Sequence, residues 1–427
     1  MGLLGCRVSF MFHTFLRILF TPLRALYHCL LGEGFQSRKS GSGKTRLIIR
    51  RELYGLTHEP LMWFCMIVAP LFCVFFFTTM MEEGLPENLP LGIVDLDNST
   101  TSRNLQRNLD AFQMVTVRAE YPNITEARKA MQRGDIYGFY YIPKGLQRKA
   151  NRQEQPTVSF YMNYSFLVAG SLLYKDQRIM SELASGAAVR TALFARGATN
   201  DQAMAYIQPI VIDSHPISNP GLNYNVYLSN TLIPGMLMLF IFMVTVYSIG
   251  MELKRNTADE LMRLADGNII RAVTGKLFPQ LVIWFTVGTI MIVWFYEILH
   301  FPCLCGMPIM WGVMTLFIVA SQAMGVFMFT ALPTPRMGLS FACLWGVLSF
   351  SICGMSYPVM AMPAPLQALA WLFPLRHYYL LYVNCALDGY PMLNAWPHIA
   401  MLIFFVAAAL IMTPRLKHAF LHYAYEA

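Results

Sequence analysis

Long apolar runs without charge alternate with polar segments along this chain, and six of the runs are long enough to cross a lipid bilayer. A transmembrane helix needs roughly 20 predominantly apolar residues in a row. The six runs cover 61–81, 231–249, 277–296, 309–332, 337–360 and 398–414. They contain no Asp, Glu, Lys or Arg. The pattern therefore predicts a polytopic α-helical membrane protein with six transmembrane helices.

The segment between the first two runs, 82–230, differs because its hydrophobic periods alternate between two and 3.6 residues. It is large enough for a folded domain of its own. Strand patterns occur at 91–97, 113–118, 136–143, 157–163 and 210–217. Helical spacing occurs at 98–112, 123–134 and 166–207, and Asn123 and Gly134 suit the start and the stop of one helix. We therefore expect an α/β domain inserted into the membrane protein.

Composition and charge agree with this division. The chain is 56% hydrophobic and 13% charged, whereas soluble domains carry about 25% charged residues. Lys and Arg gather in 44–51, in 251–276, at Arg336 and after the last run, and the loop 297–308 has none. The positive-inside rule then predicts that both termini are cytoplasmic and that 82–230 is extracytoplasmic. A positive inner surface accounts for the net charge of +8 without a nucleic-acid partner.

The segment before the first run predicts two parts. Residues 1–45 suggest a cytoplasmic interfacial arm and linker, because Arg7, Arg17 and Arg24 interrupt an apolar stretch that is too short to span. Residues 46–81 then form a cytoplasmic lead-in and the first transmembrane helix.

The run Gly43-Lys44-Thr45 resembles the end of a phosphate-binding loop, G-x-x-x-x-G-K-[ST]. Arg38 occupies the position of the first glycine. Residues 46–60 are too few to supply the sheet and the magnesium-binding acid that an NTPase needs. A flexible basic Gly/Ser linker is the favoured interpretation, and we expect no nucleotide, catalytic or metal site in this chain.

The uncharged spans argue against ion coupling, because ion-coupled transporters place ionisable residues within the membrane. Energy would then enter from the cytoplasmic side, where 252–266 has helical spacing. Arg255 and Asp259, and Asp259 and Arg263, are charge partners four residues apart. Two interpretations of 252–266 are equally supported: it is a solvated connector between spans, or it is a lever that docks on another protein.

Six segments, in order, resemble the type-2 (exporter-class) permease family of ABC transporters, in the branch with a large domain between the first two spans. The resemblance covers about 45–415. Its segments are IVDLDNSTTSRNL (93–105), YIPKGL (141–146), NPGLNYNVYLSNTLIPG (219–235), the spaced residues Glu252, Thr257, Glu260 and Leu261, GKLFP (275–279), and SYPVMAMPAPLQALAWLFPLRHY (356–378). Three features depart from the family: Asn256 stands where glycine is usual, ALPTPRMG (331–338) has two prolines, and the first 45 residues have no counterpart.

The resemblance implies a permease subunit that exports a drug or another amphiphile from the cytoplasm or inner membrane of a bacterium. It implies a separate ATPase subunit that carries ATP and magnesium, and a homodimer or heterodimer of permeases in membrane lipid. A periplasmic adaptor and an outer-membrane channel are common further partners in this branch. The family pattern assigns contact with the ATPase to a coupling helix at 252–266, through Glu252, Arg255, Thr257, Asp259, Glu260, Leu261 and Arg263.

The region 231–427 would hold the remaining five spans together with an outer segment, 357–379, that contains several prolines and no acid. Its apolar side chains predict a re-entrant or interfacial helix at 363–373, with Arg376 near the outer headgroups. Position at the mouth of the family's dimer interface implies an outer gate formed by Pro358, Met362, Pro363, Phe373, Pro374 and Arg376.

Two other classes of function stay open at this point. A membrane sensor would use the inserted domain to bind a ligand, but it would need a cytoplasmic output domain that the inner segments are too short to supply. An ion-coupled secondary transporter is disfavoured by the absence of charge in the six runs.

Overall fold

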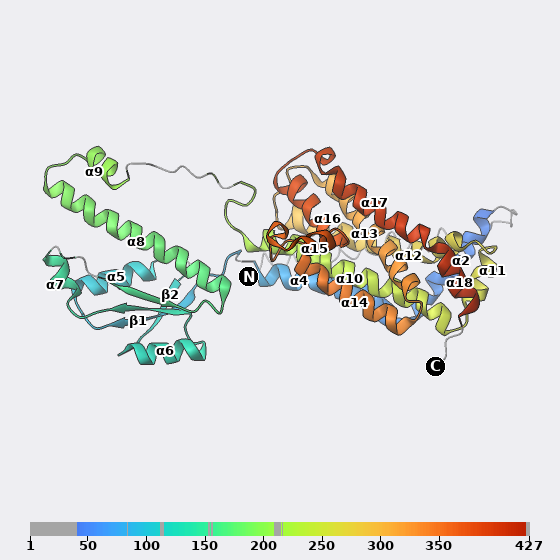
Figure 1. Cartoon of the computed structure of the whole chain (residues 1–427), viewed down its shortest axis with the longest axis horizontal. Helices are drawn as coiled ribbons and strands as arrows, with labels where there is room; N and C mark the ends of the chain where they lie inside the picture. The colour runs from blue at the N-terminus through green and yellow to red at the C-terminus, as the bar shows by residue number, and fades with distance from the viewer. Residues whose placement is uncertain are drawn as a thin grey trace, which may run out of the picture. The chain divides into compact units, whose positions relative to one another are not determined.

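The structure is a computed structural model that describes residues 41–82, 84–111, 115–152, 154, 157–208, 215 and 217–423. It divides into two compact units. The helical unit comes from the chain up to Glu82 and from Ile217 onward, and the sheet unit comes from Glu83–Pro216. Figure 1 shows the sheet unit in cyan and green. The predicted N-terminal arm lies outside the described residues.

Among the described residues, six helical segments have the length and apolar composition needed to cross a membrane, which confirms the predicted six spans. The first consists of α3 (Pro60–Trp63), a π-helical turn η1 (Phe64–Val68) and α4 (Ala69–Met80). The others are α10 (Tyr224–Lys254), α12 (Ile269–Val293) with η2 (Trp294–Ile298), α13 (Met307–Ala331), α14 (Pro335–Ile352), and η5 (Met392–Ala395) with α17 (Trp396–Ile411) and α18 (Thr413–His422).

Two of these helices have ends that differ from the apolar runs. Helix α10 begins at Tyr224 because the side chain of Asn223 caps it, accepting hydrogen bonds from the backbone N–H groups of Asn225 and Val226. Helix α14 ends at Ile352, so the run expected to continue to 360 is wrong at that end. Gly354, with φ of +102°, turns the chain out of the helix.

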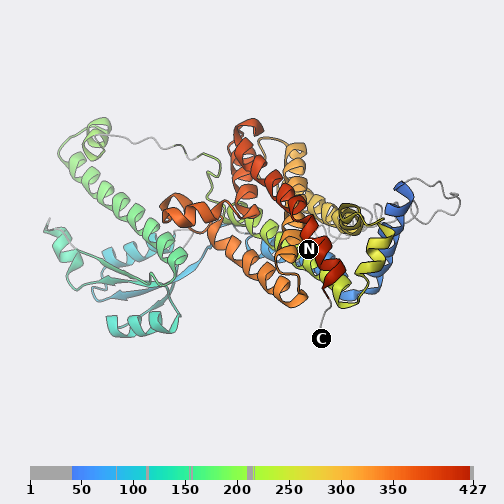
Figure 2. The ribbon, with the colours of Figure 1, turned by 45° about the vertical axis from the view of Figure 1, so that its right-hand side comes forward.

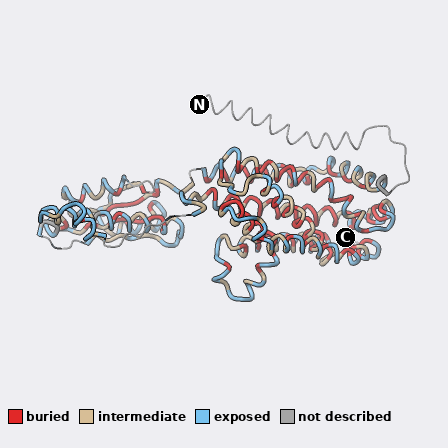
Figure 3. The backbone as a smooth tube through the Cα atoms, turned by 90° about the horizontal axis from the view of Figure 1, so that it is seen from above, coloured by how far each residue is buried: buried red, intermediate tan, exposed pale blue. Residues whose placement is uncertain are grey.

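Helix α10 lies at the centre of the helical unit and packs against α4, α13, α14 and α16 (Pro374–Leu381) (Figure 2). Apolar side chains such as Phe242 and Trp284 are fully buried between these helices. Figure 3 shows the buried positions running along the inward sides of the helices. Helices α14 and α17 instead leave large apolar side chains exposed, among them Leu344, Val347 and Phe404, as expected for helices that face lipid or another subunit.

The sheet unit is a small α/β fold with strand order β2-β1-β3-β4. Strand β1 (Leu89–Asp95) pairs in parallel with β2 (Val115–Glu120) and with β3 (Gly138–Ile142), and β4 (Ser159–Met162) pairs antiparallel with β3. Its helices are α5 (Thr100–Asp110), α6 (Ile124–Arg133), α7 (Leu146–Asn151), α8 (Leu167–Ala195) and α9 (Asn200–Ile207). The predicted inserted α/β fold is thereby confirmed in type, and the strand predicted at 210–217 falls almost entirely outside the described residues.

Alternation along β1 explains how the sheet is covered on both faces. Leu91 and Ile93 point into a core completed by α5 and α8, whereas Val94 packs with Ala127 and Ala130 of α6 on the other face. The predicted signals of α6 hold, because Asn123 accepts a hydrogen bond from the backbone N–H of Glu126 and Gly134 adopts the left-handed conformation.

Between α14 and the last span, the chain forms four short helical pieces. They are η3 (Val359–Ala361), α15 (Ala364–Ala370), α16 (Pro374–Leu381) and the π-helical turn η4 (Tyr382–Leu387). The predicted helix at 363–373 exists as α15, but it stops at Ala370, and Phe373 begins the next helix as its N-cap. Proline at the first position of α16 fits this restart, since its missing N–H has no partner there in any case.

Candidate functional site

Three helices that lie largely beyond the apolar runs gather at one end of the helical unit, and we call them the platform. They are α2 (Gly41–His58), α11 (Ala258–Leu264) and α18 (Figure 1). Helix α2 contacts α11 and α12, and α18 contacts α11 and α12 as well. A Cβ atom on Gly275 of α12 would lie 3.0 Å from Ile48 Cγ2, so glycine at this position lets α2 approach α12 closely.

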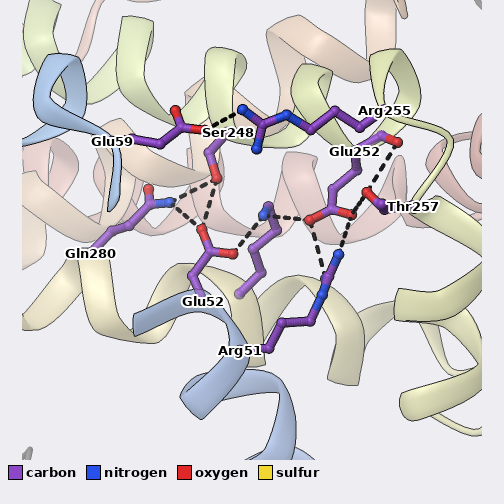
Figure 4. A network of polar contacts seen from close by, with 9 residues as sticks. Arg51, Glu52, Glu59, Ser248, Glu252, Arg255, Thr257 and Gln280 are labelled. Carbon is purple, nitrogen blue, oxygen red and sulfur yellow. Dashed lines mark hydrogen bonds and ion pairs between the residues drawn. The ribbon is translucent and has the colours of Figure 1, made fainter. Parts of the chain in front are cut away.

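A buried set of charged side chains joins the platform to two spans, and we call it the charge network. Its members are Arg51 and Glu52 from α2, Glu252 from the end of α10 and Lys276 from α12. Lys276 Nζ lies 2.7 Å from Glu52 Oε2 and 2.8 Å from Glu252 Oε1. Arg51 holds the same Glu252 carboxylate with both terminal nitrogens, at 2.9 and 3.2 Å. Figure 4 shows these contacts converging from three helices.

Neutral polar groups complete the charge network. Glu52 Oε1 accepts hydrogen bonds from Ser248 Oγ at 3.0 Å and from Gln280 Nε2 at 3.2 Å. Thr257, in the turn before α11, donates its hydroxyl to Glu252 Oε2 at 2.6 Å (Figure 4). Each carboxylate therefore has several donors, as buried charges require.

Burial makes these contacts energetically important. Lys276, Glu252 and Glu52 are only 5%, 6% and 9% exposed. The two cations and two carboxylates balance in formal charge, so the network is neutral as a whole. Burial by itself would lower the pKa of Arg51, but its hydrogen bond to Glu252 and the charge of that carboxylate outweigh burial and raise the pKa. Removing one partner from such a buried set typically costs about 3–5 kcal/mol, because it leaves an uncompensated charge.

A cavity of about 240 Å³ adjoins the charge network, and both polar and apolar side chains line it. Beside it, Arg255 forms an ion pair with Glu59, and Tyr247 donates its hydroxyl to the same carboxylate at 3.5 Å. Within the described ranges, no group of three or more His, Cys, Asp or Glu is placed to hold a metal ion.

The predicted coupling helix at 252–266 is wrong as a single helix. Helix α10 continues to Lys254, a turn follows, and α11 begins only at Ala258. Asn256 makes the turn with φ of +54°, a left-handed conformation that asparagine tolerates better than other residues with a Cβ atom. This conformation also explains why glycine suits the same position in the family pattern.

The seven predicted coupling residues divide into two groups in the structure. Glu252, Thr257 and Leu261 face inward and are buried or half-buried within the chain itself. The exposed group can meet a partner, and it consists of Arg255, Asp259, Glu260 and Arg263. The expected pair of Arg255 with Asp259 is not formed, because Glu59 takes Arg255 instead. Contact of the exposed group with an ATPase stays a prediction.

The Gly43-Lys44-Thr45 run belongs to helix α2, so the prediction of a flexible linker is wrong from Gly41 onward. Lys44 Nζ lies 2.5 Å from Asp266 Oδ1, and Arg271 also contacts this carboxylate at 3.0 Å. The hydrogen bond from Lys44 is the main cause that lowers the pKa of Asp266. This surface pairing joins the start of α2 to the end of the loop that contains α11.

The predicted outer-gate residues lie on the short pieces after α14. Phe373 is fully buried and stacks on Trp345 of α14 at a ring distance of 4.6 Å. Pro374 is buried, Met362 and Arg376 are half-buried, and Pro358 and Pro363 are exposed. The structure thus anchors one end of the segment firmly and leaves the other at the surface, and its role as a gate stays a prediction.

Sequence reasoning missed most of the charge network. Arg51 contributed only to the predicted orientation, Lys276 contributed to the orientation and to the family resemblance, and Glu52 carried no signal at all. Glu52 and Lys276 lie 224 positions apart in the chain, so only the fold brings them together. The one usable clue was Lys276 itself, a cation directly before an apolar run and inside a segment that resembles the family.

Comparison with known proteins identifies the family of the chain. Residues 60–413 match the model of a family described as ABC-2 family transporter protein. Two curated relatives, from Escherichia coli K12 and Escherichia coli O157:H7, are each named probable multidrug ABC transporter permease YbhR. Each is 23% identical over 163 residues, which is 38% of this chain and 43% of the relative. The alignment therefore spans less than half the length of these relatives.

Proposed function

The chain belongs to the ABC-2 family of transporter proteins, and from this premise we propose that it is the membrane-spanning subunit of an exporter for amphiphiles. A separate ATPase subunit would bind and hydrolyse ATP, and the platform would receive its movement. Two such permease subunits, identical or related, would face each other in a bacterial inner membrane. The relatives' names, which include the word multidrug, support an amphiphilic substrate.

The charge network is the observation that carries this proposal. It ties α2 to the ends of α10 and α12, which are the second and third spans. Thr257 links the turn before α11 to the same carboxylate. A push on α11 would therefore reach both spans through short, buried and charged contacts, which resist separation far more than exposed pairs do. Transmission by a connected body of packed helices is a known way to convert a local movement into a change of access.

The exposed side of α11 supplies the surface for a partner. Asp259 and Glu260 are exposed there, in the first turn of the helix. A hollow of about 190 Å³ lies alongside, between the turn at Asn256 and the end of α18 near His422. A hollow beside a short charged helix is the kind of place where a side chain of another protein docks.

Orientation and further partners follow from the same proposal. The platform carries the basic residues that the positive-inside rule places in the cytoplasm, and the sheet unit would then lie outside the membrane. A periplasmic adaptor and an outer-membrane channel would extend the route.

The test uses the full chain with a candidate ATPase subunit, both placed in proteoliposomes with a fluorescent amphiphilic dye. The variant Asp259→Lys/Glu260→Lys reverses the exposed charges of α11 and leaves the charge network intact. We expect ATP-dependent dye transport and copurification of the ATPase to fall at least tenfold, as interface charge reversals of a few kcal/mol produce. The matched control is Asp201→Lys/Glu154→Lys, which reverses two exposed acids of the sheet unit.

Equal transport by wild type and the α11 variant would contradict the proposed coupling surface. Transport that continues without the ATPase or without ATP would contradict the ABC exporter itself. Glu252 is unsuitable for this test, because its reversal would break the buried network and the fold with it.

A further inference from the structure

Arg376 occupies an unusual position among the cations of the helical unit. It lies in the first turn of α16, next to the bend that follows α14. The first turn of a helix has free N–H groups and the positive end of the helix dipole, so it attracts anions and disfavours cations. The first turn of α16 and the charge of Arg376 together favour the binding of an anion at this place.

No acid among the described residues pairs with Arg376. The sequence contains no Asp or Glu between Glu297 and Asp388. Among the described residues, none forms an ion pair with Arg376, and its Nε is buried without a hydrogen-bond partner. Burial lowers the pKa of the guanidinium. Arginine nevertheless stays charged in proteins, so the cost of the unmet donor remains until a ligand arrives.

The wall behind Arg376 is fixed by the bend at Gly354. Gly354 has φ of +102°, and a Cβ atom there would lie 3.5 Å from Arg376 Nη1. Tyr227 of α10 donates its hydroxyl to the backbone carbonyl of Met355 and holds the bend in place. The guanidinium therefore lies against the bend at Gly354 on one side.

The segment 357–372, which precedes Arg376, carries exposed apolar side chains. Met360 is 95% exposed, and Tyr357, Leu366 and Leu372 are exposed as well. A positioned cation beside exposed apolar groups matches an amphiphile, whose charged head and apolar body need both kinds of surface. The match would be poor for a small polar anion, since the apolar groups would stay uncovered.

We propose that Arg376 binds the anionic head, a phosphate or carboxylate, of an amphiphile whose apolar part covers the side chains of 357–372. The head could belong to a phospholipid of the outer leaflet or to the transported molecule, and both present the same chemistry to the guanidinium. The inference deepens the proposed export function by naming the charge of the ligand, but binding at Arg376 requires no transport.

The first experiment measures binding by the full chain in dodecyl maltoside, using native mass spectrometry to count bound lipid. The probes are phosphatidylglycerol, phosphatidylcholine and dodecyl phosphate, with inorganic phosphate as a head without an apolar part. We expect wild type to bind phosphatidylglycerol and dodecyl phosphate in a saturable way, and Arg376→Gln to bind both about tenfold more weakly, as loss of a charge-assisted hydrogen bond predicts. Arg376→Lys keeps the charge without the two-pronged geometry and should fall between the two.

The control variant is Arg148→Gln, which removes one exposed positive charge from the sheet unit. It should bind like wild type. Wild-type binding that does not distinguish phosphatidylglycerol from phosphatidylcholine would overturn the proposal without any variant. Equal losses in Arg376→Gln and Arg148→Gln, or saturable binding of inorganic phosphate alone, would also overturn it.

The second experiment separates the two sources of the anionic head. Proteoliposomes of phosphatidylcholine, containing the ATPase, transport either an anionic or a cationic fluorescent amphiphile. If Arg376→Gln slows only the anionic dye, the head belongs to the transported molecule. If both dyes move as in wild type while phosphatidylglycerol binding is lost, the head belongs to a resident lipid. If no dye moves with wild type while binding is intact, the export proposal fails and the anion site stands.

Discussion

Beside α2, at one end of the helical unit, Lys276 lies between two carboxylates, whereas Arg376 lies in α16, within a stretch from 298 to 387 that contains no acid. Figure 1 shows α2 and α11 at one end of the helical unit and α16 toward the other. Lys276 is buried and Arg376 is half-buried, so both incur a cost of burial. Lys276 recovers that cost inside the chain through its ion pairs with Glu52 and Glu252. Within the part of the chain that the structure describes, Arg376 forms no ion pair and its Nε has no hydrogen-bond partner. The difference indicates that the first cation serves the structure and the second serves a ligand.

The largest expected effect comes from Lys276→Met. The change leaves Glu52 and Glu252 facing each other without the cation between them, so we expect the free energy of unfolding to fall by about 3–5 kcal/mol. Thermal unfolding in detergent measures it. The double variant Glu52→Gln/Lys276→Met restores charge balance and should recover much of the loss. A loss below about 1 kcal/mol, the range of exposed pairs, would remove the contrast between the two ends.

The control for this prediction is Lys44→Met, which breaks the exposed contact with Asp266. Solvent screens that pair, so we expect no measurable change in unfolding. An equal effect of Lys44→Met and Lys276→Met would show that burial does not decide the value of these contacts.

A second prediction concerns pH at the Arg376 end. His377 is fully buried, with Nε2 at 2.8 Å from the Trp371 carbonyl and Nδ1 at 3.2 Å from His398 Nδ1. Since the carbonyl only accepts, Nε2 donates to it, and Nδ1 of neutral His377 accepts from His398. Burial is the main cause that lowers the pKa of His377 to about 4, and the charges of His398 and Arg376 add to it.

The direction in which stability changes with pH follows from the lowered pKa of His377. At a pH between about 4 and 6.5, His377 is protonated in the unfolded chain but stays neutral in the folded chain, because its pKa is lowered from 6.5 to about 4 on folding. Stability should therefore fall as pH drops through this window, by up to about 3 kcal/mol at its acid end. Unfolding of wild type and His377→Phe at pH 7 and pH 5 checks this, and the variant should lose less. Equal pH dependence of the two would contradict it.

A third prediction reverses the usual sign of a core substitution. Arg376→Met removes a cation without a partner, so in neutral detergent it should stabilise the fold by about 1–2 kcal/mol. The same change abolishes the binding of phosphatidylglycerol. Unfolding temperature with and without that lipid measures both effects. If Arg376→Met destabilises the protein in the absence of lipid, the arginine has a structural partner and the comparison with Lys276 fails.

The smallest effect is expected at the turn that joins the platform to α10. Asn256→Ala places a Cβ residue without asparagine's tolerance at φ of +54°, and this should cost about 1 kcal/mol. Asn256→Gly should be neutral or slightly stabilising. Chemical unfolding of both variants measures these changes in the free energy of unfolding. An equal loss of stability in the two would mean that the asparagine side chain, and not the backbone conformation, stabilises the turn.

Much of the fold could be predicted from local pattern. The six spans depend only on the length and apolar content of each run, and Asn123 and Gly134 mark the ends of α6 by local hydrogen bonding and backbone freedom. The errors occurred where a distant part of the chain decides. The segment 252–266 has the spacing of one helix, but the turn at Asn256 and the burial of Leu261 within the platform follow from packing.

The sequence by itself determined the membrane class, the inserted α/β fold and the family resemblance, because each depends on composition or on neighbours a few positions apart. Only the tertiary structure showed that Glu52, Glu252 and Lys276 meet, and that none of the acids it describes pairs with Arg376. The physical reason is that the energy of a charge depends on its burial and on its partners in space. For Lys276 those partners come from helices far apart in the chain, and no local pattern encodes them.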